Sequence, residues 1–289
     1  MALPTKSYSD IHGDGGSDIA GQVAEQQARL AARLGAIDRI LLTASGKGGV
    51  GKSTVATNLA AALAKAGSQV GLVDADLEGA TAARMLGASE GHARLGPNGV
   101  LPADVHGVRV MSTDLLRPGE LAWLGPVGGD AVSGSAARAT IVREFFADTA
   151  WGQLDNLIVD LPSGADFSLL PACPGPQVGM IMVTLPGLIS LRIVTRAITA
   201  ARAAGIRVLG LVVNMAYVPC DHCGKRTALG DDKAVYAAAE SLGLPVLATL
   251  PWDAAVAAAA ETGVPAVLDE GAASHAYAAL AGRVLEVLG

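Results

Sequence analysis

A glycine-rich segment that contains two lysines has the composition and spacing of a phosphate-binding loop. It reads Ala44-Ser45-Gly46-Lys47-Gly48-Gly49-Val50-Gly51-Lys52-Ser53-Thr54. The residues that fit the pattern G-x-x-x-x-G-K-[ST] are Gly46, Gly51, Lys52 and Ser53. Backbone N–H groups of such a loop converge on an anion, and the N-terminus of the following helix favours negative charge. We therefore predict that this segment binds a nucleotide, with Lys52 on the β- and γ-phosphates and the Ser53 hydroxyl on Mg²⁺. A glycine-rich turn is the alternative.

Three aspartates stand where a magnesium nucleotide needs carboxylates. Asp74 and Asp76 follow an apolar run that starts at Gln69, and Asp160 ends the run Leu157-Ile158-Val159. At the carboxyl end of a strand such side chains face nucleotide-bound Mg²⁺ or the attacking water. Because a buried acid needs a cationic partner, we predict that Asp160 supports the Mg²⁺. For Asp74 and Asp76 the alternative is capping of a helix N-terminus.

A C-x-x-C pair offers two thiolates that are close enough to share a metal or to form a disulfide. The pair is Cys220 and Cys223. Zinc or an iron–sulfur cluster takes four ligands, so a homodimer that pools two pairs would complete the set. A redox dithiol and two ordinary thiols are the alternatives. We interpret the third cysteine, Cys173, as a small buried apolar side chain.

Apolar runs alternate with helical patterns over most of the chain, which predicts βαβ units. The expected strands are Ile40–Thr43, Gln69–Asp74, Val108–Ser112, Asn156–Asp160, Val178–Thr184, Val208–Val213 and Val246–Leu250. The expected helices run from the glycine loop to Ala66 and over Ser135–Ala150, Leu188–Ala204, Asp232–Leu242, Asp253–Glu261 and Ser274–Leu288. Gly91–Val105 and Arg117–Gly134 carry Gly and Pro, so we expect loops there over the active face. The fold class is therefore α/β, a mostly parallel sheet of about seven or eight strands with helices on both faces.

The chain has 289 residues, which we divide into three parts. Residues 1–17 are rich in Gly, Ser and Asp, which predicts a disordered segment. Residues 18–36 carry apolar side chains at helical spacing, which predicts a leader helix. Residues 37–289 then form the nucleotide-binding domain.

Composition argues against several classes of binding partner. The net charge is −6 and no Lys/Arg run is present, which argues against nucleic acid. No apolar run reaches the length of a membrane span, and the polar N-terminus lacks the apolar stretch of a secretory signal. Three cysteines, two of them in one pair, do not make a secreted disulfide framework. We therefore expect a cytoplasmic protein without membrane or nucleic-acid partners.

Lys47 directly follows the first glycine of the loop, and K-G-G-V-G-K-S-T resembles the deviant Walker A sequence of the MinD/ParA family of P-loop ATPases. The resemblance implies a homodimer around two ATP molecules, in which Lys47 reaches the partner's nucleotide. A second ammonium near the transferring phosphate neutralises developing charge. The resemblance also implies that Asp76 positions the attacking water and that the Asn214 amide contacts the adenine edge. We therefore assign catalysis to Lys47, Lys52 and Asp76. A solvated lysine and a turn-forming asparagine are the alternatives.

A longer segment narrows the resemblance further. Asn214-Met215-Ala216-Tyr217-Val218-Pro219-Cys220-Asp221-His222-Cys223-Gly224 resembles the Mrp or ApbC-type family of iron–sulfur cluster carrier ATPases. Other similar segments, between Ile37 and the C-terminus, are Asp74–Leu77, Arg84–Gly87, Gly107–Ser112, Trp151–Asp155, Gly243–Pro245 and Pro251–Asp253. The resemblance implies a homodimer that binds and hydrolyses MgATP. It also implies that Cys220 and Cys223 of both subunits hold a [4Fe–4S] cluster, which is transferred to apo-proteins.

The two switch segments depart from this family. Glu78-Gly79-Ala80-Thr81 stands where Tyr-Gly-Pro-Ser is usual, and Pro162-Ser163-Gly164-Ala165-Asp166-Phe167 lacks the second Pro and the Thr of Pro-Pro-Gly-Thr-Gly-Asp. Loss of a hydroxyl beside the γ-phosphate would weaken hydrolysis or its coupling to cluster release.

Two other functions fit part of the sequence. One is a ParA/MinD-like ATP-driven dimer switch for partitioning or positioning, although a basic patch and a basic amphipathic tail are missing. The other is a zinc-bridged nucleotide-dependent scaffold.

Overall fold

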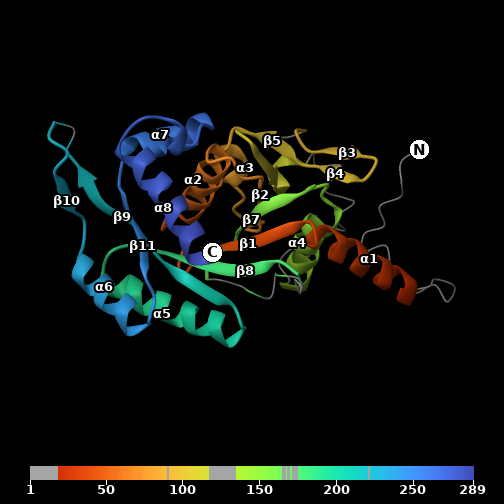
Figure 1. The fold of residues 1–289 in the computed structure, drawn as a ribbon, viewed down its shortest axis with the longest axis horizontal. Coiled ribbons are helices and arrows are strands. Elements are labelled where there is room, and N and C mark those ends of the chain that lie inside the picture. The colour runs from red at the N-terminus through yellow and green to blue at the C-terminus, as the bar shows by residue number, and fades with distance from the viewer. Residues whose placement is uncertain are drawn as a thin grey trace.

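One nine-stranded sheet organises the chain. The computed structural model describes residues 19–89, 91–116, 135–164, 167, 170, 175–220 and 222–289. Its strands are β1 (Ile37–Ser45), β2 (Val70–Asp74), β3 (Arg94–Gly96), β4 (Gly99–Leu101), β5 (Ala103–Val105), β6 (Val108–Met111), β7 (Leu154–Asp160), β8 (Gln177–Thr184), β9 (Arg207–Pro219), β10 (Arg226–Ala228) and β11 (Val246–Pro251). The sheet has the order β10-β9-β8-β1-β7-β2-β6-β5 with β11 also paired to β9, while β3 and β4 form a separate hairpin (Figure 1).

The sheet is parallel except at its edges, which confirms the predicted α/β class. Parallel pairs join β1 with β7 and β8, β2 with β6 and β7, and β9 with β8 and β11. The short strands β5 and β10 pair in the antiparallel sense with β6 and β9. All seven predicted strands are present. The sheet is larger than predicted because these two short strands are added to it.

The prediction of a loop at Gly91–Val105 is wrong, because this stretch forms β3, β4 and β5. Its Gly and Pro residues fall at or between three-residue strands, so the run looked irregular in the sequence. Val100 of β4 pairs with Thr149, which shortly precedes the amino end of β7. The hairpin therefore packs away from the carboxyl ends of the strands rather than over the active face. The loop expected at Arg117–Gly134 lies outside the described residues.

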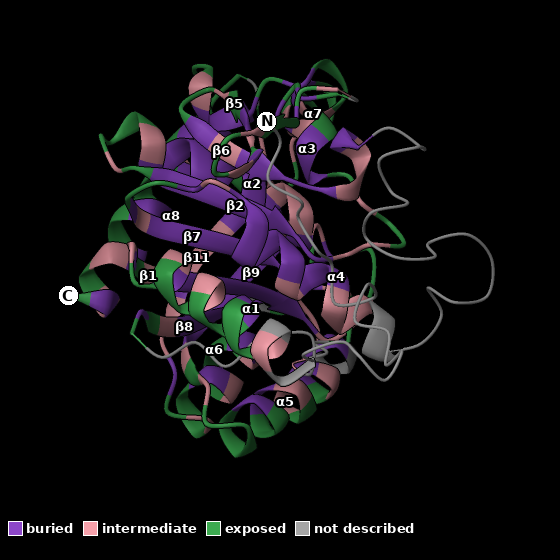
Figure 2. Cartoon of the chain, turned by 90° about the vertical axis from the view of Figure 1, so that its right-hand side faces the viewer, coloured by how far each residue is buried: buried purple, intermediate pink, exposed green. Residues whose placement is uncertain are grey.

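Helices cover both faces of the sheet. They are α1 (Ile19–Leu34), α2 (Lys52–Lys65), α3 (Ala82–Met85), α4 (Ser135–Asp148), α5 (Leu188–Ala203), α6 (Asp232–Ser241), α7 (Ala254–Thr262) and α8 (Ala272–Leu288). Figure 1 shows α2, α3 and α7 on one side and α5 with α6 on the other. The buried residues lie in the strands and on the helix sides that face them (Figure 2). All the predicted helices are present, with α3 in addition.

The predicted leader helix, residues 18–36, corresponds to α1. It packs on α4, where Arg29 Nε lies 3.4 Å from Asp148 Oδ1. Residues 1–17 lie outside the described chain, so the division into three parts stays a prediction. Among the described helices, none combines the length and the apolar character that crossing a membrane requires.

Strand register determines which side chains meet at the carboxyl edge of the sheet. Thr43 at the end of β1 pairs with Asp160 of β7, and Asp160 also pairs with Asp74 of β2. Residues paired across parallel strands project to the same face of the sheet. Two carboxylates and a hydroxyl therefore lie in one row, beside the loop that leads from β1 into α2.

Candidate functional site

The glycine loop turns from β1 into α2 through backbone conformations that favour glycine. Gly49 and Gly51 have φ values of 76° and 79°, in the left-handed region. At Gly51 a side chain also has no room, because a Cβ would lie 2.2 Å from Asn214 Nδ2. The Gly51 carbonyl accepts a hydrogen bond from the Val55 N–H at 3.0 Å, in the first turn of the helix. The N–H groups that precede this bond are left for an anion, as the sequence predicts.

Lys52 and Asp160 form a buried ion pair between the glycine loop and β7. Lys52 Nζ lies 2.6 Å from Asp160 Oδ1, and the side chains are 6% and 0% exposed. The Thr43 hydroxyl donates to the same carboxylate oxygen at 3.2 Å. Burial raises the pKa of Asp160, and the Lys52 ammonium opposes that rise. The pair holds an ammonium beside the loop in which phosphates are expected.

The other carboxylate oxygen of Asp160 is suited to a cation. Asp160 Oδ2 is buried and accepts no hydrogen bond from any residue that the structure describes. The Ser53 hydroxyl lies at the same corner, 3.4 Å from Lys52 Nζ. Buried oxygens normally have a partner, and Mg²⁺ takes oxygen ligands. Asp160 and Ser53 therefore fit the magnesium site that the sequence predicts.

The Asp74 carboxylate accepts hydrogen bonds from backbone N–H groups of the segment that follows it. Its Oδ2 accepts the N–H groups of Thr81 and Ala82 at 3.0 Å each, and its Oδ1 accepts the N–H of Asp76 at 3.2 Å. Burial, together with the charge of Asp160, raises the pKa of Asp74 to about 7. Asp74 thus caps the start of α3, the alternative that the sequence left open, and fixes the path of the chain around Asp76.

Lys47 and Asp76 keep their charged groups available. Both are half-buried, and neither side chain makes a hydrogen bond or ion pair with a described residue. The Ser45 hydroxyl donates to the Lys47 carbonyl at 3.0 Å and fixes the backbone there. Beyond Asp76, the Glu78 carboxylate pairs with Arg138 of α4 at 2.7 Å. These contacts position the backbone at both residues, and both side chains lack a polar partner among the residues that the structure describes.

The start of the second switch segment, which begins at Pro162, lies against the glycine loop. The Gly164 N–H donates to the Ser45 carbonyl at 3.0 Å. Ser163 Oγ would lie 4.0 Å from a Cβ at Gly48. A serine hydroxyl therefore stands next to the loop, although the Thr hydroxyl usual in this segment is missing from the sequence. Ala165 and Asp166 lie outside the described residues.

Asn214 contacts the glycine loop directly. It is 3% exposed, and its Nδ2 donates to the Val50 carbonyl at 2.9 Å. Beside it lies a pocket of about 120 Å³ whose lining includes Thr54, Asn214, Met215, Pro251, Trp252 and Tyr277. Trp252 and Tyr277 are not among the site residues predicted from the sequence. The segment Pro251–Asp253 did match a known family, and this was the available signal for Trp252; nothing pointed to Tyr277.

Cys220 and Cys223 lie in the turn between β9 and β10. The Cys220 N–H donates to the Lys225 carbonyl at 2.9 Å, and the Gly224 N–H donates to the Cys220 carbonyl at 2.8 Å. Both cysteines are exposed. Within the described part of the chain, no cluster of three or more His, Cys, Asp or Glu side chains could hold a metal ion. Cys173 lies outside the described residues. The turn presents two thiols at the surface, and it is separate from the glycine loop.

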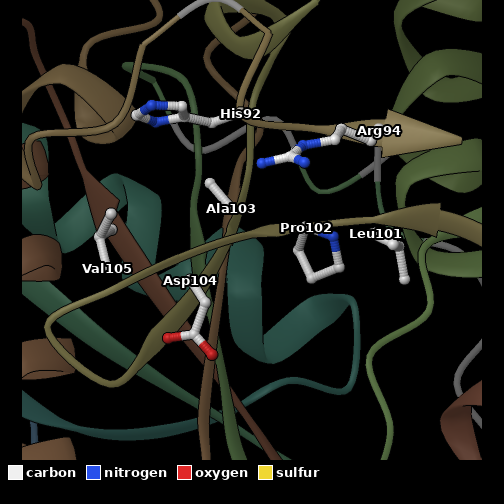
Figure 3. A pocket seen from close by; sticks show the side chains of 7 residues that line it. All are labelled: His92, Arg94, Leu101, Pro102, Ala103, Asp104 and Val105. Atoms are coloured by element: carbon white, nitrogen blue, oxygen red, sulfur yellow. The ribbon is translucent and has the colours of Figure 1, made fainter.

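A second pocket lies away from all of these residues. It has a volume of about 410 Å³ and is formed by β3 and by the segment from β4 to β5, with lining residues His92, Arg94, Leu101, Pro102, Ala103, Asp104 and Val105 (Figure 3). None of the predicted site residues lines it. The candidate site is therefore the carboxyl edge of the sheet, although the larger of these two pockets is elsewhere.

The buried ion pair should dominate stability at this edge. In Lys52→Met the Asp160 carboxylate loses its cation, so we expect the free energy of unfolding at pH 7 to fall by about 3 kcal/mol. Adding Asp160→Asn to the same chain removes the buried charge and should recover most of that loss. Urea denaturation of both single variants and the double variant measures the coupling. Lys65→Met, at the exposed carboxyl end of the same helix, is the matched control and removes only the hydrogen bond to the Val267 carbonyl. If the loss of stability in the double variant equals the sum of the losses in the two single variants, the two side chains do not stabilise each other and the ion pair is contradicted.

The raised pKa of Asp74 gives a pH dependence with a defined sign. Between the ordinary pKa of 3.8 and a value of about 7, the folded protein binds a proton that the unfolded chain has lost. The contribution of Asp74 to the free energy of unfolding therefore falls as the pH rises. We measure the free energy of unfolding of wild type and of Asp74→Asn in nucleotide-free, chelator-treated protein. We expect the difference between the two, wild type minus variant, to fall by about 2–3 kcal/mol from pH 5 to pH 8. Parallel pH curves in urea denaturation would show that Asp74 ionises normally.

Comparison with known proteins extends over most of the chain. The model of the ParA family, described as NUBPL iron-transfer P-loop NTPase, matches residues 36–285. The chain is 33% identical to a protein of Methanocaldococcus jannaschii named iron-sulfur cluster carrier protein, over 93% of this chain and 91% of that one. It is 34% identical to human cytosolic Fe-S cluster assembly factor NUBP2, over 88% and 94% of the two chains.

Solved structures agree with the fold. A nucleotide-binding protein from Archaeoglobus fulgidus in complex with ADP matches with a TM-score of 0.67 and 33% identity, over 82% of this chain and 90% of that chain. The cell division ATPase MinD of Pyrococcus furiosus matches with a TM-score of 0.62 at 24% identity, over 86% and 99%, which bears on the fold alone. Together with the glycine loop and its buried ion pair, these matches show that the chain belongs to the ParA family of NUBPL iron-transfer P-loop NTPases.

Proposed function

We propose that this P-loop ATPase is an iron–sulfur cluster carrier. Two copies of the chain bind and hydrolyse MgATP and hold a [4Fe–4S] cluster as cargo between their Cys220 and Cys223 pairs. The cluster then passes to apo-proteins. The observation that carries the proposal is the exposed C-x-x-C turn at the end of β9, in a chain whose relatives are named iron-sulfur cluster carrier proteins.

In the nucleotide site, the residues of this chain bind and orient the phosphates. The Lys52 ammonium has three N–H groups, so it can bond β- and γ-phosphate oxygens while it stays close to Asp160. Ser53 and Asp160 Oδ2 would hold Mg²⁺, which neutralises charge on the phosphates during transfer. Asp76 orients the attacking water, and Lys47 completes the nucleotide site of the partner subunit. The lack of a described partner for Lys47 or Asp76 supports both of these roles.

The pocket beside Asn214 is the proposed site of the base. The bond from Asn214 Nδ2 to the Val50 carbonyl fixes the orientation of the amide and leaves Oδ1 as an acceptor. An acceptor suits the exocyclic amino group of adenine and opposes the carbonyl oxygen that guanine carries at the same position. The proposed contact between Asn214 and adenine therefore uses Oδ1 as the acceptor, while Nδ2 of the same amide bonds to the glycine loop.

Asp76 should affect turnover much more than substrate binding. In Asp76→Asn the attacking water loses a carboxylate acceptor, and we expect kcat of ATP hydrolysis to fall about 100-fold or more with a small change in KM. Asp104→Asn, which removes an exposed carboxylate at the remote pocket, is the matched control and should keep wild-type rates. Steady-state ATPase assays decide the point. An Asp76→Asn enzyme with normal kcat would overturn the role given to Asp76.

Metal content tests the proposed cargo. After anaerobic reconstitution we expect about four irons and four sulfides per dimer, as a cluster with four cysteine ligands requires. The Cys220→Ala/Cys223→Ala variant should lose both, whereas Cys173→Ala should keep them. Iron, sulfide and zinc are measured by elemental and colorimetric analysis, and the dimer by light scattering. Zinc alone would indicate a zinc-bridged scaffold. No metal would leave an ATP-driven dimer switch.

A further inference from the structure

Strand β9 connects the residue that contacts the glycine loop to the cysteine turn. The strand runs from Arg207 to Pro219 and carries Asn214, which donates to the Val50 carbonyl of the glycine loop. Cys220 is the residue directly after the strand ends. Six residues therefore separate a contact with the glycine loop from the first thiol, a reach of at most roughly 20 Å if the chain were fully extended.

The strand has a local irregularity at the contact with the loop. Thr249 of β11 pairs with Val213, and Pro251 pairs with Tyr217, so β11 advances two residues while β9 advances four. The extra residues form a bulge at 214–216, and Met215 within it has φ of 52°. Among the described residues, His106 is the one other non-glycine residue with positive φ. Such conformations persist where the surrounding structure imposes them, and bulges of this kind are common next to functional sites.

Beyond the bulge, Tyr217 is held by three neighbours. Its carbonyl accepts the Trp252 N–H at 2.8 Å, and it pairs with Ala228 of β10. The Arg226 guanidinium lies 4.4 Å from the centre of its ring. Trp252 also lines the pocket beside Asn214. The base of the cysteine turn is thus fixed to a residue that borders the proposed nucleotide site.

We propose that Asn214 and Met215 are positioning residues that transmit nucleotide binding to the Cys220–Cys223 turn. Asn214 moves with the glycine loop because it donates to Val50. Met215 keeps the bulge in one conformation, so a displacement at Asn214 passes along β9 to Tyr217 and the turn rather than being absorbed by rotation of the backbone. This inference rests on the proposed function, because it assumes that the glycine loop binds a nucleotide and that the thiols are the functional end of β9.

Two substitutions at Met215 separate the backbone from the side chain. Met215→Ala and Met215→Gly both remove the side chain that lines the pocket. Alanine, like methionine, has only a narrow allowed range of φ in the left-handed region and is kept there by the surrounding bulge at a cost in free energy, whereas glycine adopts that region without cost and moves freely between positive and negative φ. A role of the Met215 side chain alone predicts the same behaviour for both variants. A role of the fixed backbone predicts that only the glycine variant uncouples the two sites.

The readout is the rate at which iodoacetamide alkylates the reduced, metal-free thiols, in a Cys173→Ala background so that Cys220 and Cys223 alone react. Each protein is measured without nucleotide and with saturating MgADP, at a concentration set by titration of that protein. We expect MgADP to change the rate about fivefold or more in the parent and in Met215→Ala, and by less than about twofold in Met215→Gly. Asn214→Ala, which removes the bond to Val50, should behave like the glycine variant.

A full response in Met215→Gly would overturn the inference. It would mean that MgADP acts on the thiols by another route, such as direct coverage by a second copy of the chain. The same conclusion follows if the parent binds MgADP without any change in alkylation rate, while its metal content still supports the proposed function. If Met215→Gly is unfolded by circular dichroism, Asn214→Ala decides alone. A response in Asn214→Ala equal to that of the parent overturns the inference as well.

Discussion

The buried contact between Lys52 and Asp160 is the constraint on which the rest of the nucleotide site depends. Strand register places the carboxylates of Asp160 and Asp74 side by side, with one buried ammonium to serve both. That ammonium lies 2.6 Å from Asp160, and Asp74 has backbone N–H groups as its donors instead. Burial, together with the charge of Asp160, raises the pKa of Asp74 to about 7. The site therefore has more carboxylate than its own cation neutralises. A divalent cation that arrives with a nucleotide corrects this imbalance, which gives Asp160 Oδ2 a physical reason to lack a donor.

The glycine loop is held by contacts from two other parts of the chain, the end of β7 and the strand β9. Asp160 lies beneath Lys52, the Gly164 N–H bonds to Ser45, and Asn214 bonds to Val50. Asp160 and Gly164 come from the carboxyl end of β7 and the loop that follows it, and Asn214 comes from β9, on the side of the sheet where a parallel sheet gathers its functional residues. A loop fixed in this way keeps its N–H groups directed inward before any anion binds, which reduces the entropic cost of binding.

Sequence predicted the elements whose signal is local, and it missed those that tertiary contacts define. The apolar runs before Asp74 and Asp160 marked β2 and β7, and the glycine pattern marked the loop and α2. The predicted end of β9 at Val213 is six residues too early, because the bulge at Met215 breaks strand periodicity while pairing resumes at Tyr217. The bond from Asn214 to Val50 joins residues 164 positions apart, and no local pattern encodes it. Tyr277 was missed for the same reason, since it reaches the pocket from the last helix.

The separation of the two candidate sites restricts how they can influence each other. Phosphates bound beside Lys52 do not touch the thiols at Cys220, because a segment of β9 up to roughly 20 Å long lies between the Asn214 contact and the turn. Charge acts weakly over that distance once solvent screens it, and the turn is exposed. Any effect of the nucleotide on the thiols must therefore pass through packed structure or through contact with a second subunit. Within one chain, β9 is the short covalent path, and its contacts with β11 and β10 prevent it from bending freely. Coupling along β9 therefore requires that the irregular part of the strand is rigid, and the bond from Trp252 to Tyr217 gives a second route from the pocket to the turn.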